Sequence, residues 1–163
     1  AQHDNGSIGI IRSQCVIDDV SFRRTHIRML YTEDASILLQ NCIFPDMFSE
    51  SENPAALGLD NISEHVKGIG VIPDGGRYII KNNFFGRNKG HNDVMDVDSG
   101  WRPDPILQII GNRFAGAGDE LCDLGGDVYL AENIFYNVSD VFGCSLHDLW
   151  PKRGSILTKN VQK

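Results

Sequence analysis

The chain has 163 residues, a length that suits one domain. Its 22 acidic residues outnumber its 15 basic ones and give a formal net charge of -7, which argues against nucleic acid as a partner because phosphate binding needs clustered Lys and Arg. Hydrophobic residues make up 41% of the chain, enough for a core, but the apolar runs are short, so we expect no membrane-spanning segment.

A short motif recurs along the chain: an apolar, strand-like segment, usually followed by Asn and then by an aromatic or aliphatic residue. Copies lie at 16–22, 38–44, 78–86, 108–116, 129–135 and 156–161. Their Asn residues, which we expect to stack at a turn as structural positions, are Asn41, Asn82, Asn112, Asn133 and Asn160. Asn112 and Asn133 are 21 residues apart, whereas Asn41 and Asn82 are 41 apart, an interval that fits two units. The sequence therefore predicts a repeat of about 21 to 22 residues with insertions.

A second apolar segment precedes several of these copies. These segments lie at 27–31, 68–72, 93–97, 120–124 and 141–146. They are strand-length, several alternate between apolar and polar residues, and no segment has a helical period over ten residues. The alternation places Met95 and Leu124 inward and Asp96 and Asp123 outward in one column.

Two cysteines fall in the inward positions. Cys122 and Cys144 are 22 residues apart, one unit, so their Cα atoms would lie within disulfide range if the units stack. Two reduced cysteines in a core ladder are the favoured interpretation, and a disulfide is the alternative.

Short strands at this period predict an all-β fold, a single-stranded right-handed parallel β-helix of about six coils. We expect residues 1–163 to form one β-helix domain. The polar segment 45–59 breaks the repeat and is expected to be a surface loop, and residues 147–163 are expected to cap the C-terminal end.

The stretch 90–114, together with 118–124 and 132–135, resembles the right-handed, pectin-lyase-like β-helix segments of large secreted bacterial proteins that also carry lamin-tail-like and spore-coat-kinase-like domains. The resemblance covers roughly residues 15–137. It implies a bacterial extracellular or cell-surface module and supplies no catalytic residue. A looser resemblance is to polygalacturonases: Asn92-Asp93 and Gly118-Asp119-Glu120 match two of their active-site elements, but the histidine turn and the basic element are missing.

Acidic residues gather in the 93–123 region. We expect Asp93 near Asp119 and Asp96 near Asp123, where like charges would repel or call for a cation. The favoured interpretation is a solvated polar face. A Ca²⁺ site at Asp96, Asp98 and Asp123 is the second, and Ca²⁺ is the one cofactor considered. Acid and base catalysis on a polysaccharide by Asp93, Asp119 and Glu120 is the third.

The long insertion between two copies carries the ligand-binding candidates Trp101 and Arg102, with His91 nearby. Trp101 could stack on a sugar ring or cover the groove of the solenoid. We expect a non-catalytic extracellular module for carbohydrate or protein binding, or with a structural role. The alternative is a polysaccharide-degrading hydrolase or uronate lyase. Expected partners are a polysaccharide or another surface protein, and the open strand edges allow end-to-end self-association.

Overall fold

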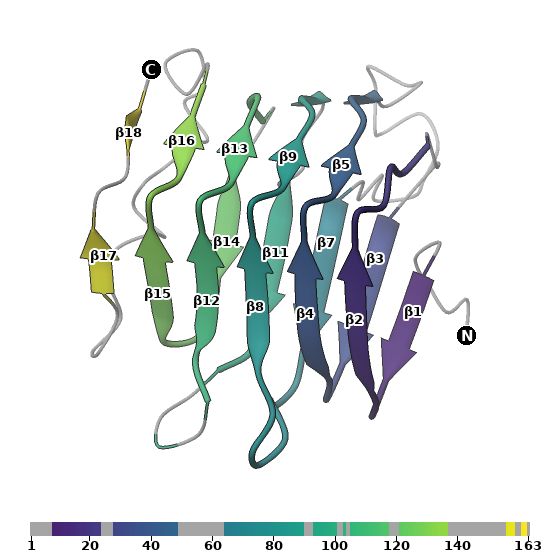
Figure 1. Ribbon diagram of the computed structural model, residues 1–163, viewed down its shortest axis with the longest axis vertical. Coiled ribbons are helices and arrows are strands. Elements are labelled where there is room, and N and C mark those ends of the chain that lie inside the picture. The colour runs from purple at the N-terminus through teal and green to yellow at the C-terminus, as the bar shows by residue number, and fades with distance from the viewer. Residues whose placement is uncertain are drawn as a thin grey trace, which may run out of the picture.

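The computed structural model describes residues 8–23, 28–48, 64–89, 93–100, 103, 105–117, 121–136, 156–158 and 161–162. These residues form strands and turns, and none of them is helical. The strands are short because glycine, aspartate and asparagine turns interrupt each apolar segment. All pairings between them are parallel, so the described part of the chain is an all-β structure of parallel sheets (Figure 1).

Three sheets account for most of the strands. Sheet A has the order β1-β3-β7-β11-β14. Its strands are β1 (Ile8–Ile11), β3 (Arg28–Glu33), β7 (Glu64–Ile69), β11 (Met95–Asp98) and β14 (Cys122–Leu124). Sheet B has the order β17-β15-β12-β8-β4-β2. Its strands are β2 (Gln14–Asp18), β4 (Ser36–Gln40), β8 (Tyr78–Lys81), β12 (Leu107–Ile110), β15 (Val128–Ala131) and β17 (Ile156–Thr158).

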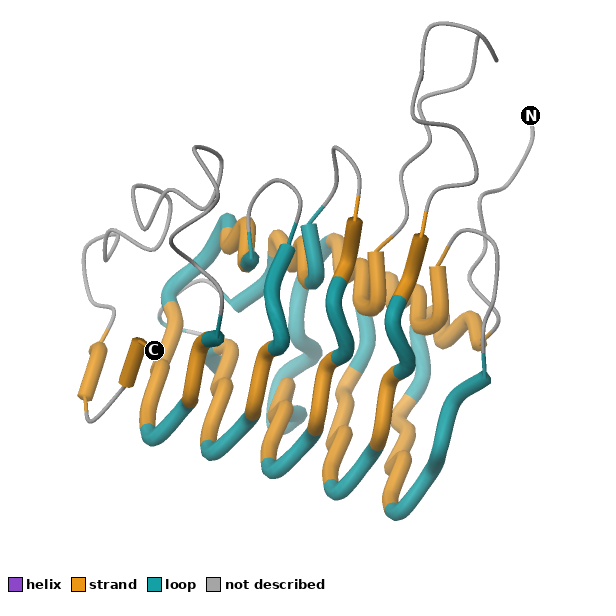
Figure 2. The backbone as a smooth tube through the Cα atoms, turned by 90° about the horizontal axis from the view of Figure 1, so that it is seen from above, coloured by secondary structure: helices purple, strands orange, loops and turns teal. Residues whose placement is uncertain are grey.

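Sheet C has the order β18-β16-β13-β9-β5. Its strands are β5 (Ile43–Phe44), β9 (Phe84–Phe85), β13 (Arg113–Phe114), β16 (Ile134–Phe135) and β18 (Val161–Gln162). A separate pair joins β6 (Met47–Phe48) to β10 (Asn88–Lys89). Along the chain, successive passes run from sheet A to sheet B to sheet C, and Figure 2 shows these passes lying side by side. Each strand therefore pairs with its equivalent in the next pass.

The core lies between the three sheets, because alternate residues of the strands point inward. β8 and β12 share the same alternation of buried and half-buried residues. A row of stacked rings runs through the interior on the sheet C side, with ring centroids 4.3 to 5.2 Å apart. The rings belong to Phe22, Phe44, Phe85, Phe114 and Phe135. This spacing matches the distance between hydrogen-bonded strands, so each pass contributes one ring to a continuous core.

The inward positions predicted for sheet A are buried, among them Met95, Val97, Cys122 and Leu124. Simple alternation fails at the start of these strands, however. His65 and Val66 are consecutive and both fully buried, and both of their amides donate to the carbonyl of Val94. A local irregularity of this kind turns one extra side chain into the core.

A ladder of buried asparagines connects sheets B and C. The Oδ1 atom of Asn112 accepts from the amide and the side chain of Asn83, at 2.9 and 3.0 Å. The Oδ1 atom of Asn133 accepts from Asn112 in the same way, at 2.9 and 3.1 Å. Each Nδ2 also donates to a carbonyl of the sheet B strand in the previous pass, so the side-chain amides satisfy backbone groups that the corner would otherwise leave unpaired.

The register corrects the predicted ladder by one residue. Tyr78 pairs with Leu107, which places Asn83, and not Asn82, beside Asn112. Asn82 and Asn41 instead occupy a neighbouring exposed turn with φ of 56° and 55°. The chain must pass through the left-handed region there, and Asn tolerates it. Asn160 lies outside the described residues.

One further expectation differs from the structure. β4 pairs directly with β8, so the 41 residues between Asn41 and Asn82 are one pass, with an insertion between sheets C and A, and not two. The segment expected as a loop at 45–59 begins with the paired strand β6, while 49–59 lie outside the described residues. Within the region expected as a cap, residues 156–158 and 161–162 continue sheets B and C, as the last copy of the motif predicts.

Candidate functional site: an acidic group on sheet A

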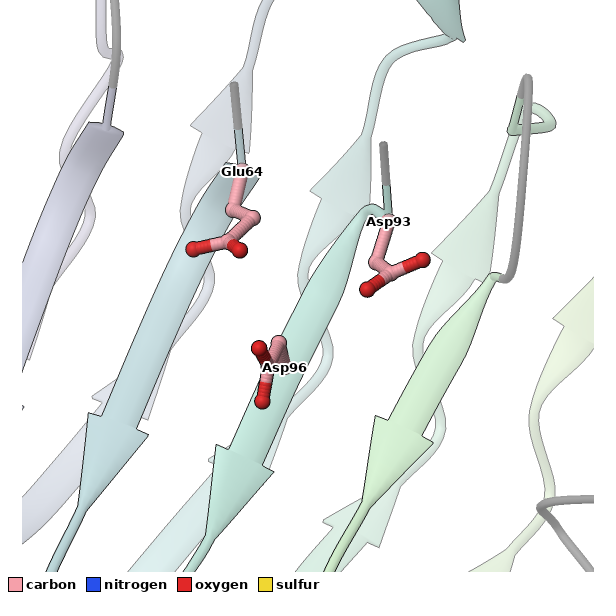
Figure 3. A group of neighbouring side chains, drawn as sticks. All are labelled: Glu64, Asp93 and Asp96. Carbon is pink, nitrogen blue, oxygen red and sulfur yellow. The ribbon is translucent and has the colours of Figure 1, made fainter. Parts of the chain in front are cut away.

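Three carboxylates come together on strands β7 and β11 and on the residue that leads into β11. One oxygen from each of Glu64, Asp93 and Asp96 lies within 4.8 Å of the others. Figure 3 shows their side chains converging over these two neighbouring strands. Glu64 begins β7, and Asp93 stands two residues before the first residue of β11. Because Met95 pairs with Val66, the register brings the starts of both strands together.

Glu64 forms a buried ion pair with Arg28 of the preceding pass. The Arg28 Nε donates to Glu64 Oε2 at 2.7 Å, and the two residues are only 9% and 3% exposed. Burial raises the pKa of Glu64, and the hydrogen bond from Arg28 opposes that rise. Removing either group would leave the other charge buried without a partner, which is costly.

Asp96 is paired in the same way. It stands beside Lys67 in the register of β7 and β11, and the Lys67 ammonium contacts its Oδ2. Both side chains are about one-fifth exposed, so this pair is more open to water than Arg28 and Glu64. On the other side, Asp96 pairs in register with Asp123 of β14, as predicted from the alternation.

Arg28 and Lys67 determine whether the three carboxylates can bind a metal ion. Arg28 and Lys67 carry two positive charges against the three negative charges of Glu64, Asp93 and Asp96, which leaves a local balance of about -1. The spacing of the oxygens alone would suit a hard cation, but a Ca²⁺ ion needs six to eight oxygen ligands and would compete with the two side chains already bound. We therefore assign no metal ligand among these residues.

The other sequence-based candidates are placed as follows. Asp98 is exposed at the end of β11, next to Gly125, and does not join the converging group. Asp119, Glu120, Trp101, Arg102, His91 and Cys144 lie outside the described residues. The predicted approach of Asp93 to Asp119, the predicted ligand-binding loop and the alternatives for Cys122 and Cys144 thus stay predictions.

Sequence reasoning missed Arg28, Glu64 and Lys67. Arg28 and Glu64 are 36 residues apart, a separation that no regular repeat would align. The insertion between sheets C and A hides this pairing, because it makes one pass look like two. The available signal was the charged residue directly before two apolar ones in Arg28-Met29-Leu30 and Asp93-Val94-Met95, but Glu64 is followed by His65 and does not share it.

The outer face of sheet C carries a second feature that the sequence did not single out. Ile43 and Phe84 are neighbours in register, and their side chains are 52% and 41% exposed. Arg113 is the next residue in the same column, and it is also exposed. Ile43, Phe84 and Arg113 therefore form a narrow exposed strip of two apolar side chains beside a guanidinium.

Comparisons of the chain with protein-family models, with curated proteins and with solved structures found no match. Among the described residues, no helix has the length and hydropathy needed to cross a bilayer.

Proposed function

We propose that the three sheets form one right-handed parallel β-helix that serves as a non-catalytic extracellular module contacting carbohydrate. The fold part is supported by the constant order in which each pass visits sheets A, B and C, and by the parallel pairing of equivalent strands. The six strands of sheet B correspond to six coils. The bacterial surface location is supported by the resemblance of the 90–135 region to secreted β-helix segments.

The non-catalytic part is carried by one observation: two of the three carboxylates that converge on sheet A, Glu64 and Asp96, are held by cations of the chain. Hydrolysis of a glycoside needs one carboxyl that gives a proton and a second that attacks or activates water, both within reach of the sugar. The raised pKa of Glu64 would suit the acid, but its side chain is buried against Arg28. Asp96 is engaged by Lys67. With Glu64 and Asp96 held in ion pairs, the group does not offer the two available carboxyls that hydrolysis needs.

The carbohydrate-contacting part is supported by the strip of Ile43, Phe84 and Arg113 on sheet C. An exposed aromatic ring can pack against the apolar face of a sugar, and a guanidinium can donate several hydrogen bonds to hydroxyl or carboxylate oxygens. The strip is made of rigid strand residues, so binding would cost little conformational entropy.

The test has two arms. In the first, the protein is incubated with a panel of acidic and neutral polysaccharides, with and without Ca²⁺, and new reducing ends and unsaturated-end absorbance are followed. We expect no release. Release that disappears in an Asp119→Asn variant would establish the alternative, a polysaccharide hydrolase or lyase.

In the second arm, retention on the same polysaccharides is measured by affinity electrophoresis. Phe84→Ala should weaken the retention seen with the best polysaccharide by several-fold. Val71→Ala is the matched control, because Val71 is an exposed apolar residue outside the strip. Equal effects of both substitutions, or no retention on any polysaccharide, would contradict the proposed binding surface.

A further inference from the structure

His65 is a buried titratable residue that neither the acidic group nor the sheet C strip uses. It lies at the start of β7 with no exposed surface. Its ring packs edge-on against Phe44 and Phe85, with centroids 5.8 and 5.9 Å away. The imidazole therefore sits in an aromatic part of the core, where sheets A and C meet.

Among the described residues, the His65 ring makes one hydrogen bond, which fixes its neutral tautomer. Its Nε2 lies 2.9 Å from the carbonyl oxygen of Pro45, and a carbonyl can only accept, so Nε2 carries the proton. Nδ1 is buried and finds no partner among the described residues. A second proton on Nδ1 would place a charged N–H in the core with nothing to receive it.

Through Pro45, His65 contacts the corner of the chain that leads into the strand pair β6 and β10. It follows β5 and leads through Asp46 into β6, which pairs with β10. The corner is completed by the amide of Met47, which donates to the carbonyl of Arg87 at 2.8 Å, and by the amide of Arg87, which donates to Asp46 Oδ1 at 2.7 Å. The hydrogen bond between His65 and Pro45 thus connects this corner to sheet A.

We propose that the contact between His65 and Pro45 is sensitive to acid. When His65 takes up a second proton, the corner formed by 45–48 and β10 opens locally while the rest of the sheets stay paired. The inference is independent of the proposed carbohydrate contact. Charged groups on the elements packed around His65 are Asp46 after β5, Arg87 after β9, Asp93 before β11, Arg28 on β3 and Glu64 on β7 itself.

The electrostatics agree with the geometry. Burial lowers the pKa of His65 from 6.5 to about 4, against the opposing effects of the hydrogen bond to Pro45 and the charge of Asp46. The closed corner therefore binds the second proton more weakly than the open one. Closure is fully favoured above pH 6.5, weakens as the pH falls from 6.5 toward 4, and changes no further below that. With these two pKa values, the open fraction should rise about twentyfold between pH 7 and pH 5.

Hydrogen exchange of single amides tests the proposal, after the intrinsic effect of pH on chemical exchange is divided out. At pH 5 the corner amides of Met47 and Arg87 should open about twentyfold more often than at pH 7, whereas the amide of His65, which donates to the Val94 carbonyl within sheet A, should stay closed. The amide of Asn112, in the distant asparagine ladder, should not change. In a His65→Phe variant, which keeps an aromatic ring but cannot titrate, the increase at Met47 should disappear.

Three results would overturn the inference: no increase at Met47, an equal increase at Asn112, or an increase that persists in His65→Phe. If that variant fails to fold, NMR titration of the His65 ring in the unmodified protein decides the matter. A pKa near 4 for His65, together with the local response at Met47, supports the proposal, and a pKa at or above 6.5 refutes it.

Discussion

The asparagine ladder gives the sharpest test of the register, because two neighbouring residues of the same type have different roles. Asn83 is buried, and its side chain makes three hydrogen bonds. Oδ1 accepts from the amide of Cys42 at 2.9 Å, and Nδ2 donates to the Leu39 carbonyl at 3.1 Å and to Asn112 Oδ1 at 3.0 Å. Asn82 is exposed, and its backbone is in the left-handed region.

The substitution Asn83→Ala removes all three bonds and leaves the buried amide of Cys42 without its acceptor. At about 1 kcal/mol for each bond, the loss is about 3 kcal/mol. For a chain of this size, that lowers the melting temperature by on the order of 10 °C. Asn82→Ala keeps the ladder and costs about 1 kcal/mol, because alanine tolerates the left-handed conformation less well than asparagine does.

The two variants are compared by reversible urea unfolding and by thermal melts, both followed by circular dichroism. Asn83→Ala should be the less stable by about 2 kcal/mol, with an unchanged urea m-value. If Asn82→Ala is equally or more destabilising, the register described here is wrong and Asn82 belongs to the ladder.

Other predictions concern the ion pairs, the left-handed turn and the candidate cofactor. Arg28→Met should destabilise the protein by about 3 kcal/mol in urea unfolding, because it leaves the Glu64 carboxylate buried without its cation; a loss below about 1 kcal/mol would contradict a buried ionised pair. Glu132→Asn should stabilise by about 1 kcal/mol, since Glu132 has a φ of 59° at the turn where Asn41 and Asn82 stand in other passes; a lower urea midpoint for this variant would contradict the strain. Millimolar Ca²⁺ or a chelator should leave the melting temperature unchanged, because Arg28 and Lys67 already hold Glu64 and Asp96; a rise with Ca²⁺ that is lost in Asp96→Asn would establish the predicted calcium site.

Much of the architecture could be predicted from the sequence because strand residues alternate in type and turns favour particular residues. The copies of the apolar motif mark the strands of sheets B and C, and the spacing from Asn112 to Asn133 gives the length of one pass. The inward and outward positions around Asp96 and Asp123 also follow from alternation alone. These features are local, so a single pass contains the information that specifies them.

The acidic group could be predicted only in part. Asp93 and Asp96 stand out as carboxylates in a repeat, but their partner Glu64 and the cations Arg28 and Lys67 come from earlier passes. The insertion between sheets C and A changes the sequence distance to these residues without changing their place in the sheet. Which charges pair between passes therefore depends on the strand register. The spacing of the motifs predicts this register wrongly, because it counts one long pass as two.

By itself, the sequence determined that the chain repeats short strands, which faces of those strands are apolar, and where tight turns fall, since these follow from residue type and local spacing. Only the tertiary structure decided that Asn83 and not Asn82 joins the ladder, that Glu64 meets Arg28, and that His65 turns into the core. The pairing of Glu64 with Arg28 depends on the length of the insertion between sheets C and A, and the other two depend on a shift of one residue between neighbouring strands. Such a shift moves a side chain from the outer to the inner face, and it is fixed by packing and buried hydrogen bonds across passes that lie far apart in the sequence.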